Sequence, residues 1–200
     1  MNTNTTILRK SVLGIAGLTF AGGLAAGPLH HDTTSTDTVD TRPAAAQTDK
    51  TGVDTAALTP HGVQGTQSHI DLDTEQTTNA KAIITATKKT GLDERAAVIS
   101  IGTALQESKL QNLGHLGDHN DHDSLGLFQQ RPSSGWGSPE QITDPEYATT
   151  AFLTGLKQVD GWQNMPLTDA AQTVQVSAYP DAYAQWEQQA ADLVTQHWNS

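Results

Sequence analysis

The sequence contains no cysteine among its 200 residues. A disulfide framework, a thiolate metal site and a cysteine nucleophile are therefore excluded. Basic residues are also few, because 11 lysines and arginines stand against 22 aspartates and glutamates and leave a formal net charge of −11. Such a charge repels nucleic acids and anionic lipids, so neither is expected as a partner. The chain is still long enough for one domain of ordinary size with a buried core.

Long apolar runs are missing except for one short stretch near the N-terminus. Arg9 and Lys10 precede SVLGIAGLTFAGGLAAG, which ends in small residues. This order is typical of a cleaved secretory signal peptide. A membrane anchor is the alternative, but the apolar part, from about Val12 to Ala26, is shorter than the roughly 20 residues that span a bilayer. We therefore predict a signal peptide over residues 1–27 and a secreted, extracellular product without a stable membrane anchor.

Large apolar residues remain scarce after this stretch. Up to about Ile70 the chain consists mainly of threonine, aspartate, alanine, glycine and glutamine. Such a composition buries too little apolar surface to offset the entropy lost on ordering. The sequence predicts a disordered linker over residues 28–70 and a folded domain over residues 71–200.

Apolar residues at helical spacing predict five helices in this domain. The first runs from about Thr74 to Lys89, and the second from the N-cap Asp93 to the segment ALQES at 104–108. The third starts at Pro145 after the N-cap Asp144 and includes Leu156, the fourth runs from Thr168 to about Ser177, and the fifth from Tyr183 to His197. On the fourth helix, Ala171, Val174 and Ala178 are expected to be buried. Residues 113–136 are rich in glycine, aspartate, histidine and serine, and their one apolar run, LGLF at 125–128, predicts a small strand or hairpin among loops. The expected fold is mainly α.

Glu107 is the most unusual acidic residue of the domain, because it ends a helix whose preceding turns are apolar or small. It follows Ala104 on the same side of that helix, so its carboxyl group is expected beside the core. Partial burial favours the protonated acid, which can donate a proton to the leaving oxygen of a glycosidic bond. The alternative is a solvated glutamate that pairs with Lys109, Arg95 or Arg131.

Several segments together resemble the lysozyme-like lytic transglycosylase family, in the form found in secreted actinobacterial wall proteins. They are ALQES at 104–108, GD at 117–118, SLGLFQQRPSSGWG at 124–137 and AAQTVQVSAYPDAYAQW at 170–186. The resemblance covers roughly residues 73–198. It implies a lysozyme-like helical domain with a small β-hairpin or loop region that cleaves the MurNAc–GlcNAc bond of peptidoglycan without a cofactor. The expected partner is the glycan strand of the cell wall, and the expected state is a monomer.

The resemblance also implies roles for single residues. Glu107 is the expected catalytic acid, and Ser108 is a neighbouring hydroxyl group. The segment expected to line the substrate cleft comprises Gly126, Leu127, Phe128, Gln129 and Gln130. The Gln129 amide can both donate to and accept from an N-acetyl sugar. Either Tyr179 or Tyr183 is expected to reach the cleft, and the pattern does not decide between them.

The loop GHLGDHNDHDS at 114–124 holds more histidine and aspartate than the family's motif requires. Asp118, Asp121 or Asp123 can be a second carboxylate that activates a water. Asp118 is preferred, because a GD dipeptide ahead of GLFQ also resembles goose-type lysozymes. A metal site built from the loop's histidines and aspartates is the alternative, but the spacing lacks the central glycine and terminal glutamate of a calcium loop. A solvated polar loop without bound metal is the expected outcome.

Trp136 lies between two glycines in SGWGSPE. An exposed indole there can stack on the apolar face of a sugar ring, whereas a buried one closes over the core. Both interpretations are open for Trp136. The other three tryptophans, Trp162, Trp186 and Trp198, are expected to pack in the core or between helices.

Two products are compatible with Glu107 as the acid. If Glu107 then accepts the proton of the muramoyl 6-hydroxyl group, a 1,6-anhydro sugar forms and no second carboxylate is needed, as in a lytic transglycosylase. If Asp118 activates a water instead, a reducing sugar forms and the enzyme is a muramidase. The resemblance favours the first product. A wall-binding protein without turnover is the rival from a different class.

Overall fold

The computed structural model describes residues 52–117 and 122–200. The predicted signal peptide, the predicted linker up to residue 51, and Asp118 and Asp121 lie outside these ranges. The described chain is mainly helical, as predicted, and no strand forms within it. Nor is any of its helices long and apolar enough to cross a bilayer.

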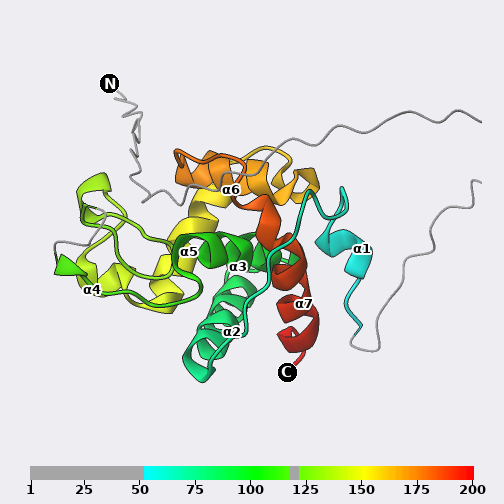
Figure 1. The fold of residues 1–200 in the computed structure, drawn as a ribbon, viewed down its shortest axis with the longest axis horizontal. Helices are drawn as coiled ribbons and strands as arrows, with labels where there is room; N and C mark the ends of the chain where they lie inside the picture. The colour runs from blue at the N-terminus through cyan, green and yellow to red at the C-terminus, as the bar shows by residue number, and fades with distance from the viewer. Residues whose placement is uncertain (1–51, 118–121) are drawn as a thin grey trace, which may run out of the picture. The chain divides into compact units, whose positions relative to one another are not determined.

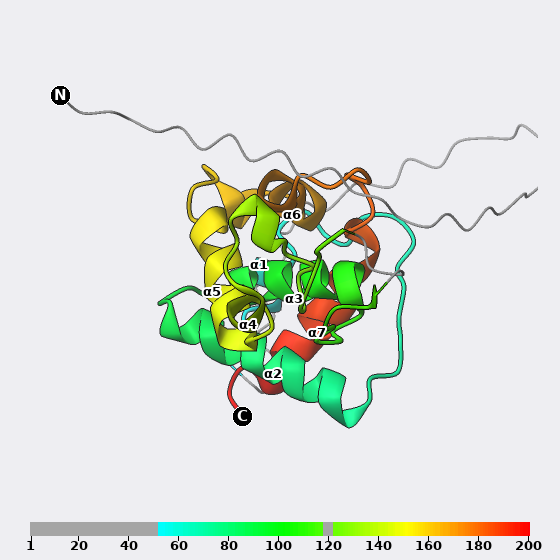
Figure 2. The ribbon, with the colours of Figure 1, turned by 90° about the vertical axis from the view of Figure 1, so that its left-hand side faces the viewer.

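The α-helices are α1 (Thr55–Leu58), α2 (Thr74–Lys89), α3 (Glu94–Ser108), α4 (Pro139–Ile142), α5 (Pro145–Leu156), α6 (Leu167–Gln175) and α7 (Glu187–His197). Three short 3-10 turns connect them, namely η2 (Pro132–Ser134), η3 (Trp162–Asn164) and η4 (Ala184–Trp186). Figures 1 and 2 show α3 in the middle, where it contacts α1, α2, α5, α6 and α7. The core is therefore built around α3.

Local signals explain where the longer helices begin. The Asp73 carboxylate accepts a hydrogen bond from the backbone N–H of Gln76, and the Gln76 side-chain oxygen accepts one from Asp73 N. The two bonds form a capping box at the start of α2. Asp93 accepts from Ala96 N, and Asp144 accepts from Tyr147 N. Each aspartate satisfies one of the backbone donors that have no acceptor within the helix. The predicted N-caps Asp93 and Asp144 are confirmed.

The central helix α3 is buried over most of its length. Every residue from Arg95 to Leu105 is buried, and the chain leaves the helix at Lys109, which has a left-handed conformation with φ 57°. At Gly102 a neighbouring side chain comes close to the helix backbone. A Cβ atom on Gly102 would lie 2.6 Å from Leu167 Cδ1. Glu107 therefore lies in the last turn of a helix that is buried over most of its length.

The predicted boundary at residue 71 is wrong, because residues 52–70 belong to the fold. Val53 and Leu58 are fully buried in the core, and α1 contacts α3 and α7. Composition alone does not reveal this, because only two apolar side chains of the segment are buried. Its backbone and its Gln67 amide also bond to residues far along the chain.

The C-terminal third also departs from the predicted elements. Helix α6 ends at Gln175, because Val176 takes the left-handed conformation with φ 54°. Val174 is consequently only half-buried and Ala178 is exposed. Tyr183 lies ahead of η4, and α7 begins only at Glu187. The predicted first and second helices agree with α2 and α3 within a residue, and α5 begins at Pro145 as predicted.

Candidate active site

Glu107 lies in the last turn of α3 and is partly buried. The Tyr183 hydroxyl group donates to Glu107 Oε1 at 2.6 Å, and Gln175 Nε2 donates to the same oxygen at 3.4 Å. Both donors are neutral and come from the C-terminal part of the chain, 68 and 76 residues away. The carboxyl group is thus oriented by side chains that the fold brings to the end of α3.

The three cations considered as partners of a solvated Glu107 contact other groups as well. Arg131 Nε donates to Ser124 Oγ at 3.1 Å. Arg95 forms a buried ion pair with Glu187 at 2.8 Å. Lys109 donates to the backbone oxygens at 105 and 106, and its ammonium group lies 4.5 Å from the centroid of the Trp186 ring. Burial lowers the pKa of Lys109, although the charge of Glu107 opposes this shift.

Tyr183 is the tyrosine that reaches Glu107. Its side chain is fully buried, whereas Tyr179 is 45% exposed. Burial raises the pKa of Tyr183, and the charge of Glu107 and the hydrogen bond to it raise it further. The phenol therefore stays neutral at physiological pH and keeps its proton for donation to Glu107. Tyr183 is therefore the tyrosine in contact with Glu107, and which of the two tyrosines reaches a substrate cleft stays a prediction.

Gln175 connects Glu107 to the segment 125–130. Besides its contact with Glu107, its Nε2 donates to the backbone oxygen of Phe128 at 2.9 Å. The side chain is 9% exposed. Sequence reasoning missed this residue, because a glutamine near a helix end carries no local signal for such a role.

The segment LGLFQQ, predicted to be a small strand or hairpin, forms a tight turn with a single bridge and no strand. Leu125 and Gln130 form one antiparallel bridge, with backbone bonds of 2.9 and 3.0 Å. The chain reverses through Gly126, with φ 72°, and Gln129, with φ 46°. A Cβ atom on Gly126 would lie 2.3 Å from the backbone oxygen of Ile142, so only glycine fits there without displacement.

The side chains of this turn point into the core. Leu127 and Phe128 are 0% and 1% exposed, and Phe128 stacks on Phe152 with ring centroids 5.0 Å apart. Gln130 is buried and donates to Ala148 O at 3.2 Å. The expectation that these three side chains line a substrate cleft is wrong, since packing leaves them no exposed surface. The partly exposed Gln129 directs its amide onto Gly126 O at 3.0 Å.

Ser108, expected as a hydroxyl group next to the catalytic acid, bonds within the protein. It is buried, and its hydroxyl group donates to Leu127 O at 2.8 Å and lies 3.2 Å from Ala104 O. The bond attaches the 125–130 turn to the end of α3. Ser108 and Gln175 therefore hold successive backbone oxygens of the turn beside Glu107.

Trp136 belongs to the core. It is 7% exposed and packs with Leu125 and Ile142 in a small cluster of its own. Its backbone oxygen accepts a bond from the Tyr147 hydroxyl group at 3.2 Å. Of the two interpretations, the structure supports the buried indole and not the sugar-stacking one. Trp162 and Trp186 are likewise buried, as expected.

Asp123 attaches the acidic loop to η2. Its carboxylate accepts from Ser133 N at 2.7 Å and from Ser133 Oγ at 2.8 Å. Desolvation raises the pKa of Asp123, but the bonds from Ser133 and the charge of Arg131 outweigh it and hold the pKa below its ordinary value. Asp118 lies outside the described residues, so its role as a second carboxylate stays a prediction. No three metal-ligating side chains gather within residues 52–117 and 122–200.

Comparison of the chain with protein-family models and with curated proteins finds no match. A function for this chain is therefore inferred from the sequence segments, the helical fold and the surroundings of Glu107.

Proposed function

We propose that this protein is a secreted lytic transglycosylase with a lysozyme-like domain, which cleaves peptidoglycan glycan strands at the MurNAc–GlcNAc bond. One observation carries the proposal. Glu107, at the end of the buried central helix, has its carboxyl group held at 2.6 Å by the neutral Tyr183 hydroxyl group. The residue that the motif predicts as the catalytic acid, Glu107, thus has a neighbour, Tyr183, that orients its carboxyl group.

In the proposed reaction, protonated Glu107 gives its proton to the glycosidic oxygen as the bond to C1 of N-acetylmuramic acid breaks. The sugar passes through an oxocarbenium-like state. The Glu107 carboxylate then removes the proton of the muramoyl 6-hydroxyl group, whose oxygen bonds to C1. The products are a 1,6-anhydro sugar and a new GlcNAc hydroxyl end, and Glu107 regains its proton.

Tyr183 contributes to both steps through its hydrogen bond. Donation to a carboxylate favours the ionised form, which Glu107 adopts between the two proton transfers. Because the phenol remains neutral, it cannot compete as the base. Asp123, bound at both oxygens by Ser133, has a structural task. These contacts leave Asp123 occupied, and the family resemblance supports a mechanism that uses one acid, which is the mechanism of a transglycosylase.

Mass spectrometry of muropeptides released from purified peptidoglycan tests the proposal. Wild type is compared with Glu107→Gln and with Glu146→Gln, which alters an exposed glutamate on α5 as a matched control. Anhydro-muropeptides are expected from wild type and from the control, but not from Glu107→Gln. Reducing ends in their place would make the protein a muramidase and implicate Asp118. Absence of release from all three proteins would overturn the enzymatic proposal and leave a wall-binding protein.

A further inference from the structure

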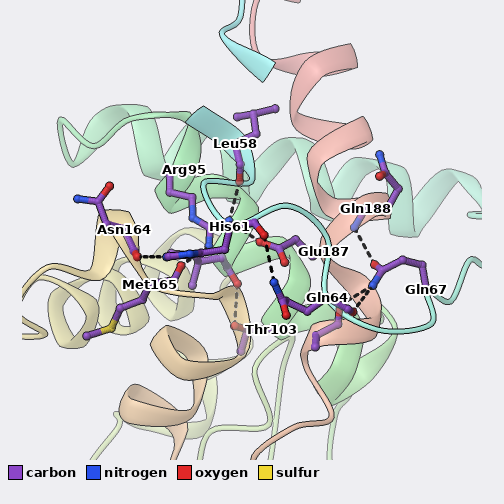
Figure 3. Close-up of polar contacts among 12 residues, drawn as sticks. Leu58, His61, Gln64, Gln67, Arg95, Thr103, Asn164, Met165, Glu187 and Gln188 are labelled. Atoms are coloured by element: carbon purple, nitrogen blue, oxygen red, sulfur yellow. Dashed lines mark hydrogen bonds and ion pairs between the residues drawn. The ribbon is translucent and has the colours of Figure 1, made fainter. Parts of the chain in front are cut away.

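Residues 61–70, called the strap below, run along η4 and the first turn of α7. Figure 3 shows Gln67 of the strap facing Gln188. Gln67 Nε2 donates to Ala184 O at 3.0 Å, while Gln67 Oε1 accepts from Gln188 N at 3.0 Å. Ser68 forms two bonds with Gln185, from its N to the backbone oxygen at 2.8 Å and from its Oγ to Oε1 at 2.6 Å.

The strap supplies a cap that α7 lacks. Trp186 occupies the N-cap position and offers no side-chain acceptor. The first backbone N–H groups of a helix have no acceptor within the helix. Gln67 Oε1 satisfies one of them from a segment that lies 121 residues away in sequence. One of the first N–H groups of α7 therefore depends on the strap for its acceptor.

The stretch held by the strap is the one that contacts residues 106 and 107. Tyr183, directly before η4, donates to Glu107. Gln185 Nε2 and Trp186 Nε1 both donate to Gln106 Oε1, at 3.2 and 2.8 Å. Three donors within four residues thus meet the end of α3, and the strap binds two residues of this stretch, Ala184 and Gln185, through other atoms.

The strap is anchored at both ends. Upstream, buried Arg95 donates to Leu58 O at 2.6 Å, to Met165 O at 2.7 Å and to Glu187 at 2.8 Å (Figure 3). Downstream, the Gln189 amide forms two bonds with the backbone of Ile70, at 3.1 and 2.7 Å. Because the strap is fixed at both ends, its bonds to Ala184 and Gln185 hold η4 in place.

We propose that Gln67 and Ser68 are positioning residues of the reaction, which hold η4 so that the Tyr183 hydroxyl group meets Glu107. The inference rests on the function proposed above. Neither residue is assigned a contact with substrate. Their effect on turnover passes through Tyr183, so it depends on the presence of the Tyr183 hydroxyl group.

The test measures kcat and KM on soluble, uncrosslinked glycan strands for the double variant Gln67→Ala with Ser68→Ala. We expect kcat to fall about tenfold, the order expected for a weakened hydrogen bond to a charged group, with KM changed less than about twofold, since no substrate contact is lost. Gln64→Ala, which removes a strap glutamine whose amide bonds only within the strap, is the matched control and should keep wild-type kcat. Gln67→Glu retains the acceptor for Gln188 N–H and should recover part of the loss.

A double-mutant cycle separates positioning from general loss of structure. In a Tyr183→Phe background, the strap substitutions should lower kcat by less than about twofold, because the bond they support is already absent. An unchanged kcat in the double variant, or a full tenfold loss in the Tyr183→Phe background, would overturn the positioning role. Absence of muropeptide release by wild type would instead overturn the proposed function itself.

Discussion

Glu187→Gln is expected to lower the free energy of unfolding strongly, because it breaks a buried ion pair. Arg95 Nη1 and Glu187 Oε1 are 2.8 Å apart, and the two side chains are only 3% and 2% exposed. Burial lowers the pKa of Arg95, and the hydrogen bond and charge of Glu187 counteract this shift. The glutamine variant keeps the shape of the side chain but leaves the guanidinium charge without its counterion.

The magnitude follows from the burial. Removing one partner of a buried ion pair costs about 3–5 kcal/mol, since the remaining charge is uncompensated. Arg95 keeps its bonds to the backbone oxygens of Leu58 and Met165, so the lower value, about 3 kcal/mol, is expected. For a domain of this size, that corresponds to a decrease of roughly 6–12 °C in Tm.

Urea unfolding followed by circular dichroism measures this difference directly. The matched control is Glu146→Gln, because Lys89 and Glu146 are 2.6 Å apart but 57% and 56% exposed. An exposed pair contributes less than about 1 kcal/mol. The m value should be unchanged in both variants. Equal losses for Glu187→Gln and Glu146→Gln would refute the argument that burial makes the Arg95 pair important.

Three further predictions follow from contacts of the site and its supporting turn. Tyr183→Phe removes a donor that favours ionised Glu107, so the acid form of Glu107 should persist to higher pH. The alkaline limb of the pH profile of kcat/KM should therefore move up by about 1 pH unit. An alkaline limb that does not move would contradict the assigned hydrogen bond. Gly126→Ala should cost at least about 2 kcal/mol in urea unfolding, because alanine is strained at φ 72° and its Cβ meets a backbone oxygen; a smaller loss would show that the turn relaxes. Asp123→Asn should lower stability near neutral pH but not in acid. The pKa of Asp123 is lower in the folded state than in the unfolded state, so the stability contributed by its bonds to Ser133 is present above the unfolded pKa and is lost as pH falls through the folded pKa. Thermal melts of wild type and Asp123→Asn over that pH range measure this loss. A difference in Tm that stays constant with pH would contradict the prediction.

The helices that were predicted well are those with complete local signals. Helix α2 has apolar residues at helical spacing and a capping box, and α5 has the N-cap Asp144 followed by Pro145. These patterns act within a few residues, so they can be read without knowing the rest of the chain. Helix α6 was predicted too long, because the left-handed conformation of Val176 has no such signal.

The candidate acid could be selected from the pattern, but its surroundings could not. Glu107 follows an apolar helical run, which a sequence displays directly. Gln175 and Tyr183 reach it only because α6 and η4 pack against α3. The same packing turns Leu127 and Phe128 into core residues, although their motif predicted a surface role.

By itself the sequence determined the helical class, the ends of the best-capped helices and the position of the candidate acid, because periodicity and capping act over one or two turns. The tertiary structure alone decided that residues 52–70 belong to the fold and that Tyr183, not Tyr179, meets Glu107. Both outcomes depend on partners separated by more than 70 residues, such as the 117 residues between Gln67 and Ala184. No local pattern encodes such contacts, because they form only when the helices pack around α3.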